Sequence, residues 1–186
     1  MVIIVKIFFM ARSSEKWEHQ FIIAKTLLES MEPYKDNDDL IRSFCVGLRN
    51  PIVFDNQVTE AYHFLPYKLE EYENVKGPLT EDHLIGISNI VLYIFKNEIY
   101  KRWNTVEDFK RTLKAFQVLL TVPKALNDKG SYKHGWQFNV DNINECISWD
   151  VKLKNENINY LIDESGNQVS VDDVWNEWYQ QYSDFL

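Results

Sequence analysis

The chain has 186 residues, of which 45% are hydrophobic, 26% charged and 15% aromatic. This composition is typical of a soluble globular domain and excludes a disordered chain, a collagen-like repeat and a disulfide scaffold. No apolar run approaches the roughly 20 residues that a membrane-spanning helix needs, so we expect no membrane partner.

The formal net charge is -8, and the acidity is concentrated in the C-terminal third. Residues 131–186 contain three basic and ten acidic side chains. Such a surface would repel nucleic acid and attract a basic protein partner; the alternative is a solvated acidic face that only aids solubility. We expect a mainly helical body over residues 1–130 and a small acidic α+β module over 131–186, with one continuous domain as the alternative.

The two cysteines, Cys45 and Cys146, lie far apart and outside any CxxC motif. This pattern favours free thiols in a reducing compartment and a cytoplasmic location. Residues 1–9 are apolar but follow no basic region, so they predict a strand rather than a signal peptide. Translation from Met10, which would make them a tail, is the alternative.

Helical periodicity predicts the first elements. A helix capped by Ser13 or Ser14 should run to about Met31, with a polar loop over 33–39 and a short helix over 40–48. Residues 53–65 are ambiguous and strand-like before Pro66.

Two further helices follow, and we expect them to form an antiparallel hairpin. Thr80 should open the first, whose apolar stripe comprises Leu84, Ile87, Val91 and Phe95. Thr105 and Asp108 form a capping-box pattern that should open the second. The apolar stripe of the second helix comprises Phe109, Leu113, Phe116 and Leu120.

The pattern then changes. Alternation over residues 146–153 and an apolar run at 158–162 predict strands joined to the last element by a turn at 163–167. Ser170 should cap a final helix with one aromatic face comprising Trp175, Trp178, Tyr179 and Tyr182. The predicted fold class is α+β: a mainly helical N-terminal body with a helical hairpin, followed by a small antiparallel sheet closed by a C-terminal helix.

Common catalytic motifs are absent from the sequence. It has six glycines, no glycine-rich phosphate loop, no GxSxG and no HExxH. Nucleotide binding by such a loop and serine or cysteine nucleophile chemistry therefore have no local signature.

One segment carries three residues in a suggestive order: His63, Asn74 and His83, with ten and eight residues between them. This order resembles the His-Asn-His (HNH) nuclease element. The resemblance implies that His63 activates water as a general base and that Asn74 orients this histidine and its loop. It also implies that His83 and Glu60 hold a divalent cation, Mg²⁺, Mn²⁺ or Zn²⁺, against the scissile phosphate.

The segment departs from the family pattern where a second helix ligand, one turn after His83, would be expected, because Ile87 stands there. The structural alternative is that His83 lies in the polar first turn of a helix and His63 in a half-exposed strand.

A basic stretch offers a second indication of nucleic-acid contact. Residues 96–114 contain six basic side chains with aromatic residues between them. The candidate nucleic-acid-binding residues are Lys101, Arg102, Trp103, Lys110, Arg111 and Lys114. The lysines and arginines would neutralise phosphates and Trp103 would stack on a base; the alternative is a solvated hairpin end with Trp103 in the core.

Two functional hypotheses follow. The first is a metal-dependent DNA endonuclease of HNH-like type from a phage or mobile element. The second is a non-catalytic acidic protein that binds or inhibits a basic partner, for example as a DNA mimic, with the aromatic side chains of the last helix as anchors.

Overall fold

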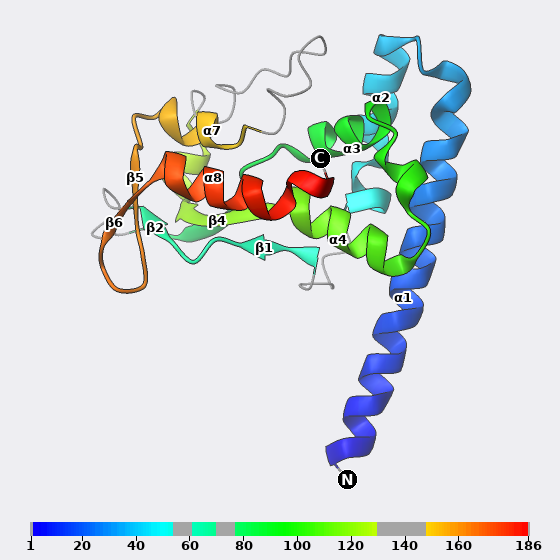
Figure 1. Ribbon diagram of the computed structural model, residues 1–186, viewed down its shortest axis with the longest axis horizontal. Helices are drawn as coiled ribbons and strands as arrows, with labels where there is room; N and C mark the ends of the chain where they lie inside the picture. Colours follow the sequence, from blue (N-terminus) through cyan, green and yellow to red (C-terminus); the bar gives the residue numbers. More distant parts are fainter. Residues whose placement is uncertain (1, 54–60, 70–76, 130–147, 186) are drawn as a thin grey trace. The chain divides into compact units, whose positions relative to one another are not determined.

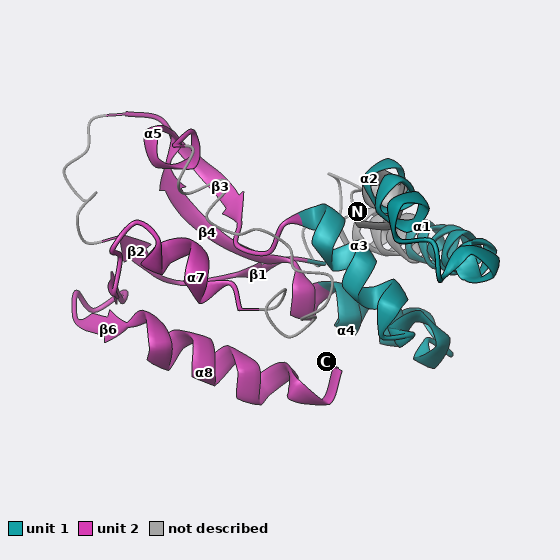
Figure 2. Cartoon of the chain, turned by 90° about the horizontal axis from the view of Figure 1, so that it is seen from above, with its two compact units in different colours: residues 1–61, 87–113 teal, residues 62–86, 114–186 magenta. Residues whose placement is uncertain are grey.

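The computed structural model describes residues 2–53, 61–69, 77–129 and 148–185 (Figure 1). They form an α+β fold, which confirms the predicted class. Contacts within the chain define two compact units, residues 1–61 with 87–113 and residues 62–86 with 114–186 (Figure 2). Both units are interleaved in the sequence, whereas the predicted division at residue 130 rests on composition and stays a prediction.

The first unit is helical. Its elements are α1 (Val2–Met31), a 3-10 turn (Glu32–Tyr34), α2 (Asp38–Val53), α3 (Ile87–Lys96), a 3-10 turn (Ile99–Arg102) and most of α4 (Val106–Phe116). Helix α2 packs against both α1 and α3. The predicted strand over residues 1–9 is wrong, because α1 begins at Val2.

Aromatic rings fill the centre of this unit. Phe109 packs edge-on against Trp17 and Trp103, with ring centroids 6.0 and 4.9 Å apart. The side chain of Lys25 crosses to this cluster and donates to the Trp103 carbonyl at 2.7 Å. Burial of such large apolar rings is the main stabilising contribution available to a helical unit of this size.

The second unit contains two three-stranded sheets and the C-terminal helices. Its elements are β1 (His63–Phe64), β2 (Lys68–Leu69), β3 (Leu79–His83), β4 (Val118–Pro123), α5 (Lys124–Asn127), α7 (Asp150–Lys154), β5 (Tyr160–Ile162), β6 (Gln168–Ser170), α8 (Val171–Tyr182) and a final 3-10 turn (Ser183–Phe185). In the first sheet β4 lies between β1 and β3, parallel to β1 and antiparallel to β3. In the second sheet β5 lies between β2 and β6, and both pairings are antiparallel.

Three further predictions of secondary structure are wrong. Residues 79–83 form β3 and not the first turn of a helix, so α3 begins only at Ile87. Leu120 belongs to the buried strand β4 and not to the preceding helix. The alternating segment that ends at Leu153 forms the short helix α7 where the structure describes it, which buries Trp149 and Leu153 one turn apart.

Two of the predicted caps are confirmed, but the cap at Ser13 or Ser14 is wrong, because both residues lie inside α1, which begins at Val2. The Asp108 amide donates to the Thr105 hydroxyl, while Asp108 Oδ2 accepts from the Thr105 amide at 2.9 Å. Ser170 caps α8 by accepting from the Asp173 amide at 3.0 Å. In the part of the chain that the structure describes, no helix is both long and apolar enough to cross a membrane.

Candidate functional site

The two histidines of the HNH-like segment lie in one sheet but on opposite faces. His63 of β1 pairs with Val118 of the central strand β4, whereas His83 of β3 pairs with the next residue, Leu119. Paired residues project to the same face of a sheet, and successive residues project to alternate faces. The imidazoles of His63 and His83 therefore point away from each other.

His83 shares its face with two aromatic residues, Phe64 of β1 and Tyr62 just before this strand. Its ring packs edge-on against Tyr62, at 5.9 Å between centroids, and Tyr62 contacts Phe64 in the same way. Burial lowers the pKa of His83 to about 4, because a charged imidazole is disfavoured away from water. At neutral pH this histidine is an uncharged member of an aromatic cluster.

His63 lies on the other face, beneath the C-terminal helix. Its Nδ1 is 2.7 Å from the hydroxyl oxygen of Tyr182 in α8, and the two rings meet edge-on at 5.4 Å. Burial lowers the pKa of His63, with a smaller contribution of the same sign from Lys114, while Glu177 opposes it. A neutral imidazole near pH 7 is what a general base needs, but here its Nδ1 is engaged by Tyr182.

Asp82, the residue before His83, forms a buried ion pair. Asp82 projects to the face of His63, since it pairs with Leu120, and its Oδ2 lies 2.5 Å from Nζ of Lys152. Lys152 also donates to the His83 carbonyl at 3.0 Å. Both side chains of this ion pair are almost fully buried, so Asp82 neutralises a lysine instead of ligating a cation.

The remaining HNH candidates, Glu60 and Asn74, lie outside the described residues. Within the described ranges, no cluster of three or more His, Cys, Asp or Glu side chains is arranged to hold a metal ion. The HNH-like constellation as a whole stays a prediction, and its two described histidines are not brought together.

Two of the basic candidates form ion pairs within the first unit. Lys101 pairs with Glu32 and Glu98, each at 2.8 Å, and Lys110 pairs with Glu107 at 2.8 Å. Arg102, Arg111 and Lys114 are exposed, so their charges remain available to solvent.

Trp103 corrects the base-stacking prediction. It is only 1% exposed, and its indole donates to the Thr112 hydroxyl at 2.9 Å. A ring held in the core in this way cannot stack on a base, so the structural alternative is the correct one for this residue.

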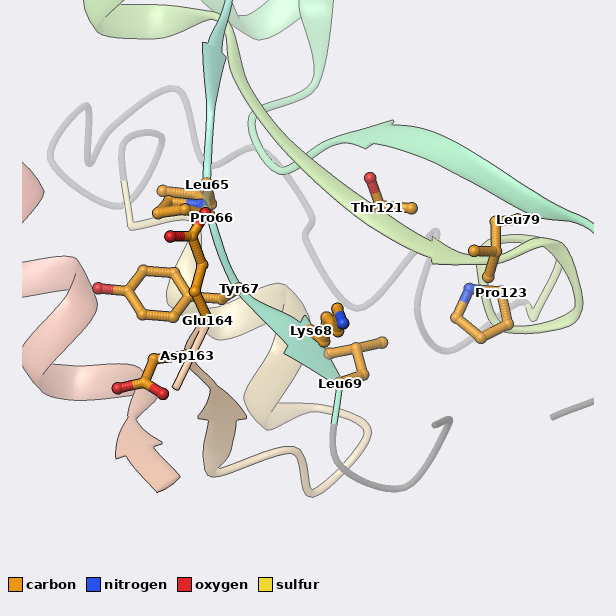
Figure 3. Close-up of a pocket in the computed structure, with 10 residues that line it drawn as sticks. All are labelled: Leu65, Pro66, Tyr67, Lys68, Leu69, Leu79, Thr121, Pro123, Asp163 and Glu164. Carbon is orange, nitrogen blue, oxygen red and sulfur yellow. The ribbon is translucent and has the colours of Figure 1, made fainter. Parts of the chain in front are cut away.

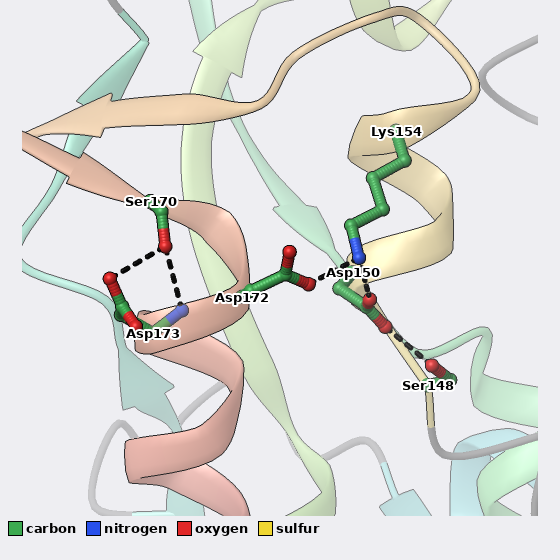
Figure 4. Close-up of polar contacts among 6 residues, drawn as sticks. All are labelled: Ser148, Asp150, Lys154, Ser170, Asp172 and Asp173. Atoms are coloured by element: carbon green, nitrogen blue, oxygen red, sulfur yellow. Dashed lines mark hydrogen bonds and ion pairs between the residues drawn. The ribbon is translucent and has the colours of Figure 1, made fainter.

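Both lysines of the acidic segment, residues 148–185, form ion pairs within the protein. Lys152 binds Asp82, and Lys154 pairs with Asp150 at 2.9 Å and with Asp172 of α8 (Figure 4). These carboxylates raise the pKa of Lys154. Residues 148–185 hold eight carboxylates and only these two lysines, so their remaining charge is negative.

Helix α8 has both buried and solvent-facing aromatic residues, which corrects the prediction of a single aromatic face. Trp178 and Tyr182 are buried together with Val171 and Val174. Trp175 and Tyr179 instead stack on each other at 5.1 Å with nearly parallel rings. Tyr179 is 43% exposed and Trp175 is half-buried, so one ring of the stack faces solvent on a helix with three acidic and no basic residues.

An open cavity lies between the two sheets of the second unit (Figure 3). Its volume is about 770 Å³. It is lined by β2 and the preceding loop, the start of β3, the end of β4, and the turn between β5 and β6. The lining is apolar at Leu65, Leu69 and Leu79, and acidic at Asp163 and Glu164.

Sequence reasoning did not identify this cavity. The turn signal at residues 163–167 was visible, but the opposite wall is formed by β3, which the sequence predicted as a helix. Only the pairing of β3 with β4 brings Leu79 beside Pro123, since these two residues are register partners.

Comparison with protein-family models, curated proteins and solved structures found no match to this chain.

Proposed function

We propose that this chain is a protein-binding module that recognises a basic protein segment through the acidic surface of residues 148–185. The observation that carries the proposal is the internal use of both lysines of this segment. Lys152 is buried against Asp82, and Lys154 is held between Asp150 and Asp172. The unpaired charge offered to a partner is then of one sign.

The stack of the exposed Tyr179 on the half-buried Trp175 supplies an anchor for such a partner. Aromatic residues dominate the binding energy of protein interfaces because they bury large area with little loss of side-chain freedom. Trp175 and Tyr179 are stacked on each other before any partner arrives. Lysine and arginine side chains bind favourably over such rings, and the carboxylates of α8 add long-range attraction.

A cytoplasmic location belongs to the same proposal. Cys45 is a free and buried thiol, and burial raises its pKa to about 12. An unreactive core thiol of this kind suits a reducing compartment.

An HNH-like nuclease is the competing hypothesis, and the geometry favours it less. Its chemistry needs His63 and His83 close to one cation, whereas the β-sheet register directs them to opposite faces. In addition, the His63 ring is bound to Tyr182.

Titration with a labelled lysine- and arginine-rich peptide tests the proposal. We expect saturable binding that weakens steeply as salt rises from about 50 to 300 mM, because the attraction between exposed charges is screened. A peptide of the same length with glutamates in place of the basic residues is the control and should not bind. Equal binding of both peptides, or of neither, would contradict the proposal.

A supercoiled plasmid incubated with Mg²⁺, Mn²⁺ or Zn²⁺ tests the competing hypothesis in parallel. We expect no metal-dependent nicking. Nicking that disappears both with EDTA and in the His63→Ala variant would instead establish the nuclease.

A further inference from the structure

We infer that the cavity between the two sheets of the second unit receives an apolar side chain of the basic partner, while a neighbouring lysine or arginine of that partner binds the carboxylates at its rim. The inference rests on the proposed function and adds a sequence preference to it: an apolar residue next to a basic one.

The size and the lining of the cavity suit an apolar side chain. A volume of about 770 Å³ lies within the range of roughly 300–1,000 Å³ that is typical of ligand sites. Leu65 and Leu69 form part of the wall. Leu79 is 63% exposed in the chain as it stands, and covering such an apolar surface is favourable.

The acidic rim is a preformed turn. Asp163 Oδ1 accepts from the amides of Ser165 and Asn167, each at 2.8 Å. Gly166 has φ of +85°, a conformation that other residues rarely adopt. These backbone hydrogen bonds, led by that of Asn167, lower the pKa of Asp163, so the rim is charged at neutral pH and needs little ordering on binding.

The two ends of the cavity differ in charge. Asp163 and Glu164 lie at one end of the cavity and Leu79 at the other, with Lys68 and Leu69 of β2 between them (Figure 3). A basic residue of the partner is attracted to the acidic side and repelled from Lys68. The partner's cation should therefore bind beside the turn and its apolar residue toward Leu79.

Negative charge on α8 also acts at the acidic end of the cavity. Tyr67 lines the cavity, and the charges of Glu177 and Asp163, added to its burial, raise its pKa. Carboxylates of α8 and of the β5–β6 turn thus act on one side chain. A peptide that reaches from the cavity to α8 meets negative charge along its path.

Two labelled peptides and two pairs of variants test the inference. The first peptide carries one leucine flanked by lysines, and the second has serine in its place. Glu164→Lys reverses a rim charge, and Glu18→Lys on α1 is its control with the same change in net charge. Leu79→Trp fills the cavity, and Val46→Trp, at another exposed position, is the control for added bulk.

We expect the leucine peptide to bind at least about fivefold more tightly than the serine peptide. Leu79→Trp should abolish that difference, and Val46→Trp should preserve it. Glu164→Lys should weaken binding by about tenfold or more, and Glu18→Lys by less than about twofold.

The outcomes separate the inference from the proposed function. If both peptides bind equally, or if Glu164→Lys and Glu18→Lys have the same effect, the cavity is not the site and the inference is overturned while the module still binds basic segments. If neither peptide binds to the unaltered protein, the proposed function itself fails. Circular dichroism of each variant confirms that the exposed substitutions leave the fold intact.

Discussion

Nδ1 of His63 lies 2.7 Å from the hydroxyl oxygen of Tyr182, which joins the first strand of one sheet to the end of the last helix. The contact explains how the C-terminal helix is fixed over the sheet. It also indicates a structural role for His63, because its ring packs against Tyr182 on the face of the sheet that α8 covers.

Tyr182→Phe should lower the free energy of unfolding by about 1 kcal/mol, because it removes one hydrogen bond and leaves a half-buried nitrogen without its partner. Tyr179→Phe, on the exposed stack of the same helix, should change it by less than about 0.5 kcal/mol. Denaturant unfolding followed by tryptophan fluorescence measures both. Equal effects of the two substitutions would show that the His63–Tyr182 contact adds no stability.

His83 should make the protein less stable in mild acid. Its pKa in the folded chain is about 4, below the usual value near 6.5, so the unfolded chain takes up a proton first as the pH falls. Stability should be complete above about pH 6.5 and should decrease by up to about 3 kcal/mol toward pH 4. Unfolding curves across this range measure the slope.

His83→Phe keeps a ring beside Tyr62 but cannot titrate, so it should remove most of that slope. His19→Gln, on the exposed side of α1, is the control and should leave the slope unchanged. A slope that persists in His83→Phe would assign it to other groups.

A single substitution in the buried ion pair of Lys152 and Asp82 should be strongly destabilising. Lys152→Met leaves a carboxylate buried without its lysine and should cost about 3–5 kcal/mol. Adding Asp82→Asn should recover more than half of that loss, because the remaining group is uncharged. A double variant as unstable as the single one would mean that the charge pair is not what holds these elements together.

Trp103→Ala should destabilise the first unit by about 3–5 kcal/mol, since it empties a large core position. Tyr160→Ala, at a side chain that is 51% exposed, should cost less than about 1 kcal/mol. Thermal unfolding compares the two. A small effect of Trp103→Ala would contradict its place in the core.

Helices with strong local signals could be predicted from the sequence. Thr105 with Asp108, and Ser170 with Asp173, are caps whose hydrogen bonds involve residues only three positions apart, so no tertiary information is needed to recognise them. The turn at Asp163 is local in the same sense.

Elements whose state depends on distant partners could not be predicted in this way. The Thr80–Asp82 segment has the residues of a helix start, yet it forms a strand because five consecutive residues of β3 pair with β4. Periodicity alone cannot distinguish the short apolar run of β4 from a buried helical turn.

The geometry of the candidate site is harder to predict from the sequence than the helices, because it depends on these strand pairings. The resemblance to the HNH element predicts that His63 and His83 act at one site, but their adjacent partners in β4, Val118 and Leu119, direct them to opposite faces. A shift of one residue in the pairing of β1 or β3 with β4 would have placed both histidines on one face. The local sequence pattern does not determine the register of this pairing.

NMR titration of the ¹⁵N-labelled protein with the leucine-containing basic peptide tests the central claim most directly, because it locates the binding surface residue by residue. We predict the largest shifts at Trp175, Tyr179 and Glu164, with the signals of α1 unchanged. Shifts confined to the helical unit, or no shifts at saturating peptide, would contradict the assignment of the acidic C-terminal segment as the binding surface.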